Sequence, residues 1–260
     1  MPAARSSIPT IAAVSIVAYA ACDLIHEALG HGVACLFVRS VKPVSISSVA
    51  LQTDGVSRAV AASGTVANIV VGLTALAALR IAHRFTAGTF FAWLLAATNL
   101  MNATGYLVLS GATNTGDWGV VIRNASPLWA WRIALIALGV SGYAATVIVV
   151  ARRLARFVRE GMLGSREPGR LAWGAYLAGG TLLVVASALN RISPALILTS
   201  GASTGFGAMA GLLAVPPLVE RETSAAQPQG PALPFRPAWL VAGAIVGALF
   251  IGVLGPGVSL

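Results

Sequence analysis

Four ionisable side chains lie within nine residues of the first apolar stretch of the chain: Asp23, His26, Glu27 and His31. Ionisable residues inside an apolar helix are costly and usually functional. The sequence His26-Glu27-Ala28-Leu29-Gly30-His31 contains the residue types of zinc peptidases, in which two imidazoles hold the ion and the glutamate acts as general base. This cluster is the strongest chemical signal in the sequence.

The spacing of the two histidines departs from the usual HExxH motif, in which they are four residues apart on one helix face. Here they are five apart, which places them about 140° apart and about 7.5 Å along the axis of a regular α-helix. A one-residue π-bulge would return both imidazoles to one face, and such bulges favour functional sites. Gly30 tolerates unusual backbone. A metal site at His26 and His31 therefore requires a local π-bulge.

The same cluster allows two other interpretations. Glu27 and His31, four residues apart, could form an ion pair within the helix. The four side chains together could instead line a proton or ion path, as in a transporter. The residue types alone leave the metal site and these alternatives open.

The composition indicates which elements must position this cluster. Hydrophobic residues make up 57% of the 260 residues and charged residues 10%, against about 25% charged in ordinary soluble chains. These fractions exclude a soluble globular domain and a disordered chain. They predict an all-α, polytopic helical protein that is integral to a membrane and crosses it several times.

Seven stretches are long and apolar enough to span a bilayer, which takes about 20 residues. They are Ile8–Val38, Ala59–Leu79, Ala87–Ser110, Leu128–Ala151, Leu171–Asn190, Pro194–Val219 and Ala238–Gly255. The sixth is interrupted by small polar residues, so we expect a kinked or re-entrant helix. Pro43–Val56 alternates apolar and polar residues and predicts one or two short strands. We therefore expect six to seven transmembrane helices with a β-like segment after the first.

The net charge of +9 comes from 17 basic and eight acidic residues, with the cations between the apolar stretches. This placement predicts contact with anionic membrane lipid and excludes nucleic acid as a partner. Eleven cations lie on the side of the N-terminus and six on the other, which predicts a cytoplasmic N-terminus. Cys22 and Cys35 are interpreted as buried thiols.

Residues 8–121 resemble the site-2 protease family of intramembrane zinc metalloproteases. The resemblance rests on the HE…H motif, the β-like segment, the stretch Ala62–Asn68, which is similar to the family's A-G-P-x-x-N, and Asn114–Trp118, which is similar to its N…DG context. Thr65 replaces the family's proline, and Trp118 follows the acid where the family has glycine. The HExxGH spelling also resembles the zinc motif of the dipeptidyl peptidase III family.

The resemblance implies that His26, His31 and Asp117 bind Zn²⁺ and that Glu27 is the catalytic base. It implies a catalytic core in residues 1–125 and additional transmembrane helices of unknown role in 126–260. The substrate would be a transmembrane protein or peptide. Asn68 could bond to the substrate backbone or only to its neighbouring helix, and Pro43–Val56 could pair with the substrate as a strand or be a plain surface loop. The resemblance also implies an extracytoplasmic N-terminus, so the orientation stays open.

The prediction for function is therefore a zinc-dependent intramembrane endopeptidase. Two alternatives remain open. One is a non-catalytic relative that binds membrane segments, and the other is a transporter or ion carrier that uses the first-helix cluster. Because one and three membrane crossings end on the same side, His31 and Asp117 can meet, as the metal site requires.

Overall fold

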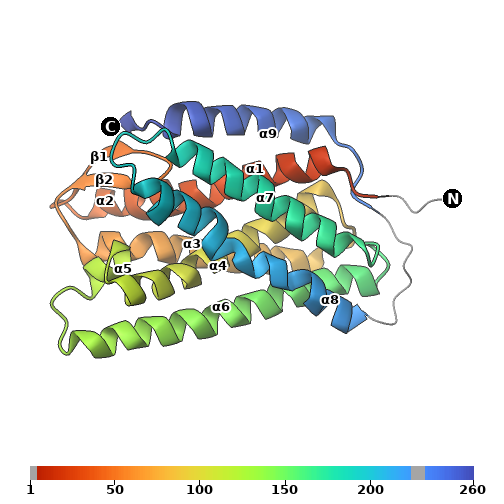
Figure 1. The fold of residues 1–260 in the computed structure, drawn as a ribbon, viewed down its shortest axis with the longest axis horizontal. Helices are drawn as coiled ribbons and strands as arrows, with labels where there is room; N and C mark the ends of the chain where they lie inside the picture. The colour runs from red at the N-terminus through yellow and green to blue at the C-terminus, as the bar shows by residue number, and fades with distance from the viewer. Residues whose placement is uncertain (1–4, 224–231) are drawn as a thin grey trace.

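The computed structural model describes residues 5–223 and 232–260 as a bundle of long helical segments that run back and forth along one axis (Figure 1). The segments in chain order are α1 Ile8–Leu24, η1 Ile25–Gly32, α2 Val33–Phe37, β1 Lys42–Ile46, β2 Leu51–Asp54, α3 Arg58–Ala78, η2 Leu79–Ile81, α4 Ala87–Thr113, α5 Gly116–Val121, α6 Leu128–Arg159, α7 Glu167–Ser187, η3 Ile197–Gly207, η4 Ala208–Ala214, α8 Val215–Thr223, α9 Pro237–Leu249, η5 Phe250–Leu254 and β3 Val258–Ser259.

The predicted helical membrane fold is confirmed. Six helices within the described residues are long and apolar enough to cross a membrane. They span Ile8–Phe37, Arg58–Ile81, Leu128–Arg159, Glu167–Ser187, Ile197–Thr223 and Pro237–Leu254. The remaining predicted stretch, Ala87–Ser110, is α4, which has 27 residues but carries Asn99 and Asn102 in its middle and is not among the six. Neighbouring helices cover α4, so it can hold polar side chains that lipid would not tolerate.

Local sequence explains where the elements near the metal cluster begin and end. The hydroxyls of Ser57 and Thr86 accept hydrogen bonds from the first turns of α3 and α4, as N-cap residues do. Helix α4 ends at Asn114, whose φ of 56° is left-handed, a conformation that asparagine adopts at helix ends. This residue turns the chain into α5, which carries Asp117.

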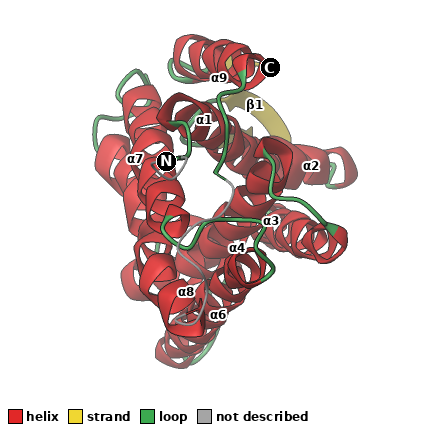
Figure 2. Ribbon diagram, turned by 90° about the vertical axis from the view of Figure 1, so that its right-hand side faces the viewer, coloured by secondary structure: helices red, strands yellow, loops and turns green. Residues whose placement is uncertain are grey.

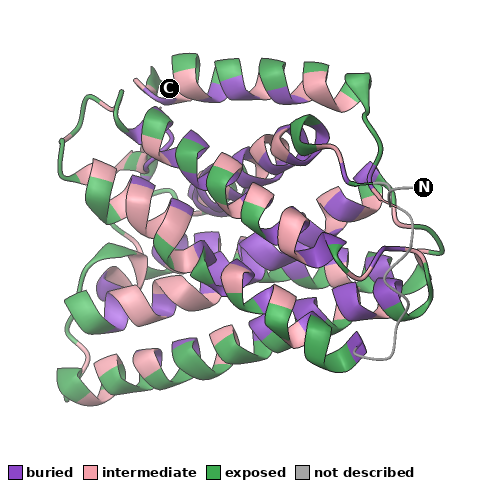
Figure 3. Ribbon diagram, turned by 45° about the vertical axis from the view of Figure 1, so that its right-hand side comes forward, coloured by how far each residue is buried: buried purple, intermediate pink, exposed green. Residues whose placement is uncertain are grey.

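The core of the bundle lies between α1, α4, α6 and α7. Its largest fully buried side chains include Tyr19 from α1, Trp93 from α4 and Phe157 from α6. The end-on view shows the helices gathered around this centre (Figure 2), and the buried residues concentrate on the inner helices, whereas the outer faces of α6 and α9 are exposed (Figure 3). Residues 1–125 and 126–260 thus share one core, and their division remains a prediction about function.

The predicted strands form a small antiparallel sheet at the end of the bundle where the first helical segment ends. β2 lies within the predicted Pro43–Val56 segment, and β1 begins one residue before it. No sequence pattern indicated a third strand, β3, which comes from the other end of the chain and pairs with β1. The strand order β2-β1-β3 leaves β2 at an edge of the sheet.

The sixth apolar stretch is continuous but irregular. A π-helix, η3, passes into a 3₁₀-helix, η4, and then into α8. The predicted interruption therefore changes the type of helix rather than turning the chain back.

Cys22 and Cys35 are buried free thiols, as predicted.

Candidate metal centre

The first helical segment contains the π-helix that the spacing of its histidines requires. Residues Ile25–Gly32 form η1, with regular α-helix on both sides. In this conformation residues five apart lie on one face, because each hydrogen bond spans five residues. The His26 and His31 rings consequently lie edge to face, with their centroids 4.8 Å apart.

Asp117 reaches both imidazoles from α5. Its Oδ2 atom lies 3.0 Å from Nε2 of His26 and 3.1 Å from Nε2 of His31. Three ligands about 2.0–2.1 Å from a tetrahedral zinc ion would be roughly 3.3–3.4 Å apart. The Asp117 oxygen thus lies at nearly the separation from each imidazole nitrogen that one shared ion would impose.

The opposite nitrogen of each imidazole is held by an oxygen acceptor. His26 Nδ1 donates to Oδ1 of Asn68 over 2.6 Å, and His31 Nδ1 donates to the carbonyl of Val60 over 2.7 Å. An oxygen acceptor requires the proton to sit on Nδ1, which points the Nε2 lone pair of the neutral ring toward Asp117. Metal-binding histidines are oriented in this way by their outer-shell partners.

Asn68 is completely buried, and its side-chain amide is hydrogen-bonded to other groups of the protein. Its Nδ2 donates to the carbonyl of Cys22 and, over 2.7 Å, to Oδ1 of Asn99. These donor contacts fix which side of the amide faces His26. They favour a role in positioning His26 over the predicted contact with substrate.

Two glycines bring the π-helix and α3 into close contact. A Cβ on Gly30 would collide with the backbone of Gly64. A Cβ on Gly64 would lie 2.7 Å from Nε2 of both His26 and His31. Gly30 therefore serves close packing, since its φ is not among the positive values of the described residues. Gly64 leaves room for whatever lies between the two imidazoles.

The environment of Asp117 keeps its carboxyl group ionised. Burial raises the pKa of this carboxyl, but when the imidazoles are protonated, their Nε2–H groups donate hydrogen bonds to it that outweigh burial and lower its pKa to about 2. An ionised carboxylate beside two imidazoles is the charge state that binds a metal cation.

Glu27 is a second carboxylate near the imidazoles. A ligand atom from each of His26, Glu27 and His31 lies within 4.8 Å of the others. However, Oε2 of Glu27 accepts a 2.6 Å hydrogen bond from the backbone N–H of Leu51 in β2. Asp117 is closer to both Nε2 atoms, so we assign Asp117 as the third ligand and leave Glu27 for proton transfer.

A cavity of about 190 Å³ gives access to this group. Glu27, His31 and Asp117 line it on one side, and β2 with the start of α3 lines it on the other. Tyr106 of α4 completes the wall, with its ring edge to face with His26 at a centroid distance of 5.5 Å. The sequence analysis missed Tyr106, because a single tyrosine in an apolar helix carries no pattern.

Asp23 is the fourth ionisable residue of the first-helix cluster. In the described residues its Oδ2 atom is buried without a hydrogen-bond partner, and the imidazoles are oriented by Asn68 and Val60 instead. The Val60 acceptor is a backbone carbonyl, which no side-chain motif could have indicated.

Comparisons with known protein families, with curated proteins and with solved structures found no match to this chain. The resemblance to site-2 proteases remains a prediction that depends on the motifs themselves. What the geometry establishes is coarser: a buried His26-Glu27-His31 group that could hold a metal ion.

Proposed function

We propose that this chain is an integral, multi-pass membrane protein and a zinc-dependent endopeptidase that cleaves membrane-embedded or membrane-edge peptide segments. The supporting observation is the convergence of His26, His31 and Asp117 on one point, with Glu27 beside them. The group lies on one of six helices that are long and apolar enough to cross a membrane.

The donor set favours zinc over the harder divalent cations. Two imidazole nitrogens and one carboxylate oxygen suit zinc, whereas magnesium and calcium prefer oxygen ligands alone. Three protein ligands leave a fourth coordination position, which is the arrangement of catalytic zinc sites. When bound, zinc acts as a Lewis acid on a carbonyl and lowers the pKa of water.

Glu27 is the proton carrier in this proposal. Its carboxylate lines the cavity, where it can take a proton from an attacking water molecule and pass it to the leaving amine. The hydrogen bond from Leu51 N–H holds the carboxylate at the edge of β2. The base is thereby positioned between the metal ligands and the strand.

The edge strand β2 supports a substrate that binds in extended form. Peptide groups alternate along a strand, so the backbone groups of Leu51 and Thr53 point to the same side, away from β1. Both residues line the cavity. Glu27 already occupies the Leu51 N–H, so a substrate strand could pair with the Leu51 carbonyl and the backbone groups of Thr53, which would bring its scissile carbonyl near Glu27.

Metal analysis of the purified protein tests the centre. We expect about one zinc ion per chain, which His26→Ala and Asp117→Ala remove. His83→Ala is the matched control, because His83 is exposed in the turn between α3 and α4 and should leave the metal content unchanged. A wild-type protein that binds no zinc under these conditions contradicts the proposal.

Cleavage of a reconstituted transmembrane peptide tests the chemistry. Glu27→Gln should retain zinc and lower the rate by about 10²-fold or more, the scale of general base catalysis. If the protein binds zinc but does not cleave the peptide, and Glu27→Gln changes neither result, the non-catalytic alternative is supported. Ion transport that depends on His31 and Asp23 without bound zinc would support the carrier.

A further inference from the structure

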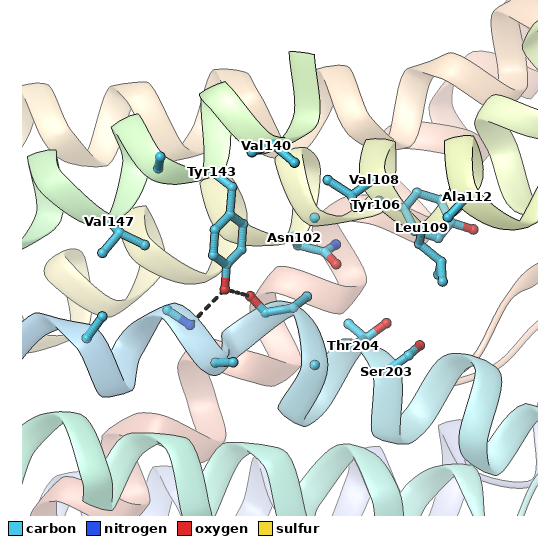
Figure 4. Close-up of a pocket in the computed structure, with 17 residues that line it drawn as sticks. Asn102, Tyr106, Val108, Leu109, Ala112, Val140, Tyr143, Val147, Ser203 and Thr204 are labelled. Carbon is cyan, nitrogen blue, oxygen red and sulfur yellow. Dashed lines mark hydrogen bonds between the residues drawn. The ribbon is translucent and has the colours of Figure 1, made fainter. Parts of the chain in front are cut away.

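A second and larger cavity of about 770 Å³ lies beside the metal centre, between α4, α6 and the irregular segment η3–η4. Helix α4 lines one side of this cavity, with residues from Asn102 to Ala112. These positions extend about 15 Å along α4. Figure 4 shows Asn102 on the α4 side and Ser203 and Thr204 on the opposite wall.

The cavity opens through the side of the bundle. Helix α6 packs against α8 at one end, and the η3–η4 segment that leads into α8 diverges from α6 toward the metal centre (Figure 1). The lining residues Ala144, Gly207 and Ala210 are exposed at this opening. In a helical bundle of membrane-spanning length, an opening on the side faces lipid. We name this cavity the lateral groove.

The walls of the lateral groove select an apolar occupant. None of the described residues that line it is charged, and most are small or aliphatic. Small side chains allow the close approach of another backbone within a membrane. Tyr143 holds the irregular wall in place, because its hydroxyl donates to the carbonyl of Ala208 and accepts from the N–H of Gly211.

One polar atom distinguishes a peptide occupant from an acyl chain. Asn102 is 6% exposed, and its Oδ1 accepts no hydrogen bond from the described residues. Tyr106 lies one turn further along α4, with its hydroxyl against Gly116 and the backbone of Asp117. A peptide N–H can donate to the Asn102 oxygen, whereas a hydrocarbon chain offers no donor.

The lateral groove adjoins the metal centre at Tyr106, which lines both cavities. We propose that the lateral groove binds the apolar, membrane-embedded segment of a peptide substrate and leads it past Tyr106 to the metal centre. This inference rests on the proposed function. The 15 Å of α4 that line the lateral groove match about four or five residues of extended chain. In that form the peptide groups are free to form hydrogen bonds with another strand.

Two neighbouring alanines of α6 provide a matched test. Ala144 lines the lateral groove and Ala145 does not, although both are exposed. Ala144→Phe should raise KM for a transmembrane peptide about tenfold, and leave KM for a short soluble peptide and the zinc content unchanged. Ala145→Phe should change none of these. An equal effect of the two variants, or a loss of affinity for both peptides, overturns the inference.

A second measurement does not require catalysis. In an inactive Glu27→Gln background, Ala144→Cys is labelled with a maleimide in lipid vesicles, while Cys22 and Cys35 are buried. The transmembrane peptide should slow labelling of Ala144→Cys and not of Ala145→Cys. Slow labelling in vesicles without peptide, compared with detergent, would show a lipid occupant and overturn the proposal. If the peptide protects Ala144→Cys from labelling but the wild type does not cleave it, the lateral groove binds peptide and the proposed peptidase function is wrong.

Discussion

The indole Nε1 of Trp118 donates a 2.9 Å hydrogen bond to Oγ1 of Thr65. This bond joins α5, which carries Asp117, to α3, which carries Gly64 and Asn68. The two residues stand where the site-2 protease pattern has glycine and proline. The two departures from that pattern are therefore in direct contact, and together they position the third predicted ligand.

We expect Thr65→Val to weaken zinc binding about tenfold, within the range for partners that orient metal ligands. The valine keeps the shape of the buried threonine but leaves Nε1 of Trp118 without its acceptor. Competition with a chelator measures the affinity. Thr65→Ser keeps the hydroxyl and should bind like the wild type, and an equal loss in both variants would contradict a hydrogen-bond effect.

Gly64→Ala should lower zinc affinity by about 100-fold. The added methyl group would lie 2.7 Å from both Nε2 atoms and force the imidazoles apart. Gly88→Ala is the control, since a Cβ there meets nothing closer than 3.7 Å. Zinc titration, together with thermal unfolding to verify the fold, decides the outcome. Wild-type affinity in Gly64→Ala would mean that the imidazoles do not hold the metal.

Deletion of Leu29 should preserve zinc binding to within about tenfold. Leu29 is exposed in the π-helix, and its removal converts HExxGH to HExxH, which regular α-helix places on one face. Insertion of one alanine after Leu29 should abolish binding, because it rotates His31 by about 100°. Loss of binding in the deletion, with a folded protein, would show that the π-helix itself is essential.

Asn68→Leu should weaken zinc binding by about 10- to 100-fold, because His26 loses its Nδ1 acceptor. At saturating zinc, KM for peptide should then return to that of the wild type. A KM that stays raised at full zinc occupancy would instead support the predicted contact between Asn68 and substrate.

The metal centre lies at the end of the bundle opposite the Arg-rich α3–α4 and α6–α7 turns (Figure 1). The positive-inside rule then places the centre near the extracytoplasmic face. A membrane-impermeant maleimide applied to whole cells should label Ser40→Cys and not Gly161→Cys. The reverse pattern would support the orientation that the site-2 protease resemblance implies.

Hydropathy and local spacing were sufficient to predict much of this protein. The apolar stretches predicted the helices, because bilayer thickness and backbone hydrogen bonding leave few alternatives. The five-residue spacing of His26 and His31 indicated the need for a π-helix, because helix geometry is local. The alternation in Pro43–Val56 predicted β1 and β2 for the same reason.

Tertiary structure alone decided what surrounds the two histidines. The Val60 carbonyl is chemically identical to every other backbone carbonyl, and only packing brings it to His31. The space beneath the imidazoles depends on Gly64 meeting the π-helix, and Tyr106 borders two cavities because α4 passes between them. These contacts join residues far apart in the chain, and their energies depend on distances that no local pattern encodes.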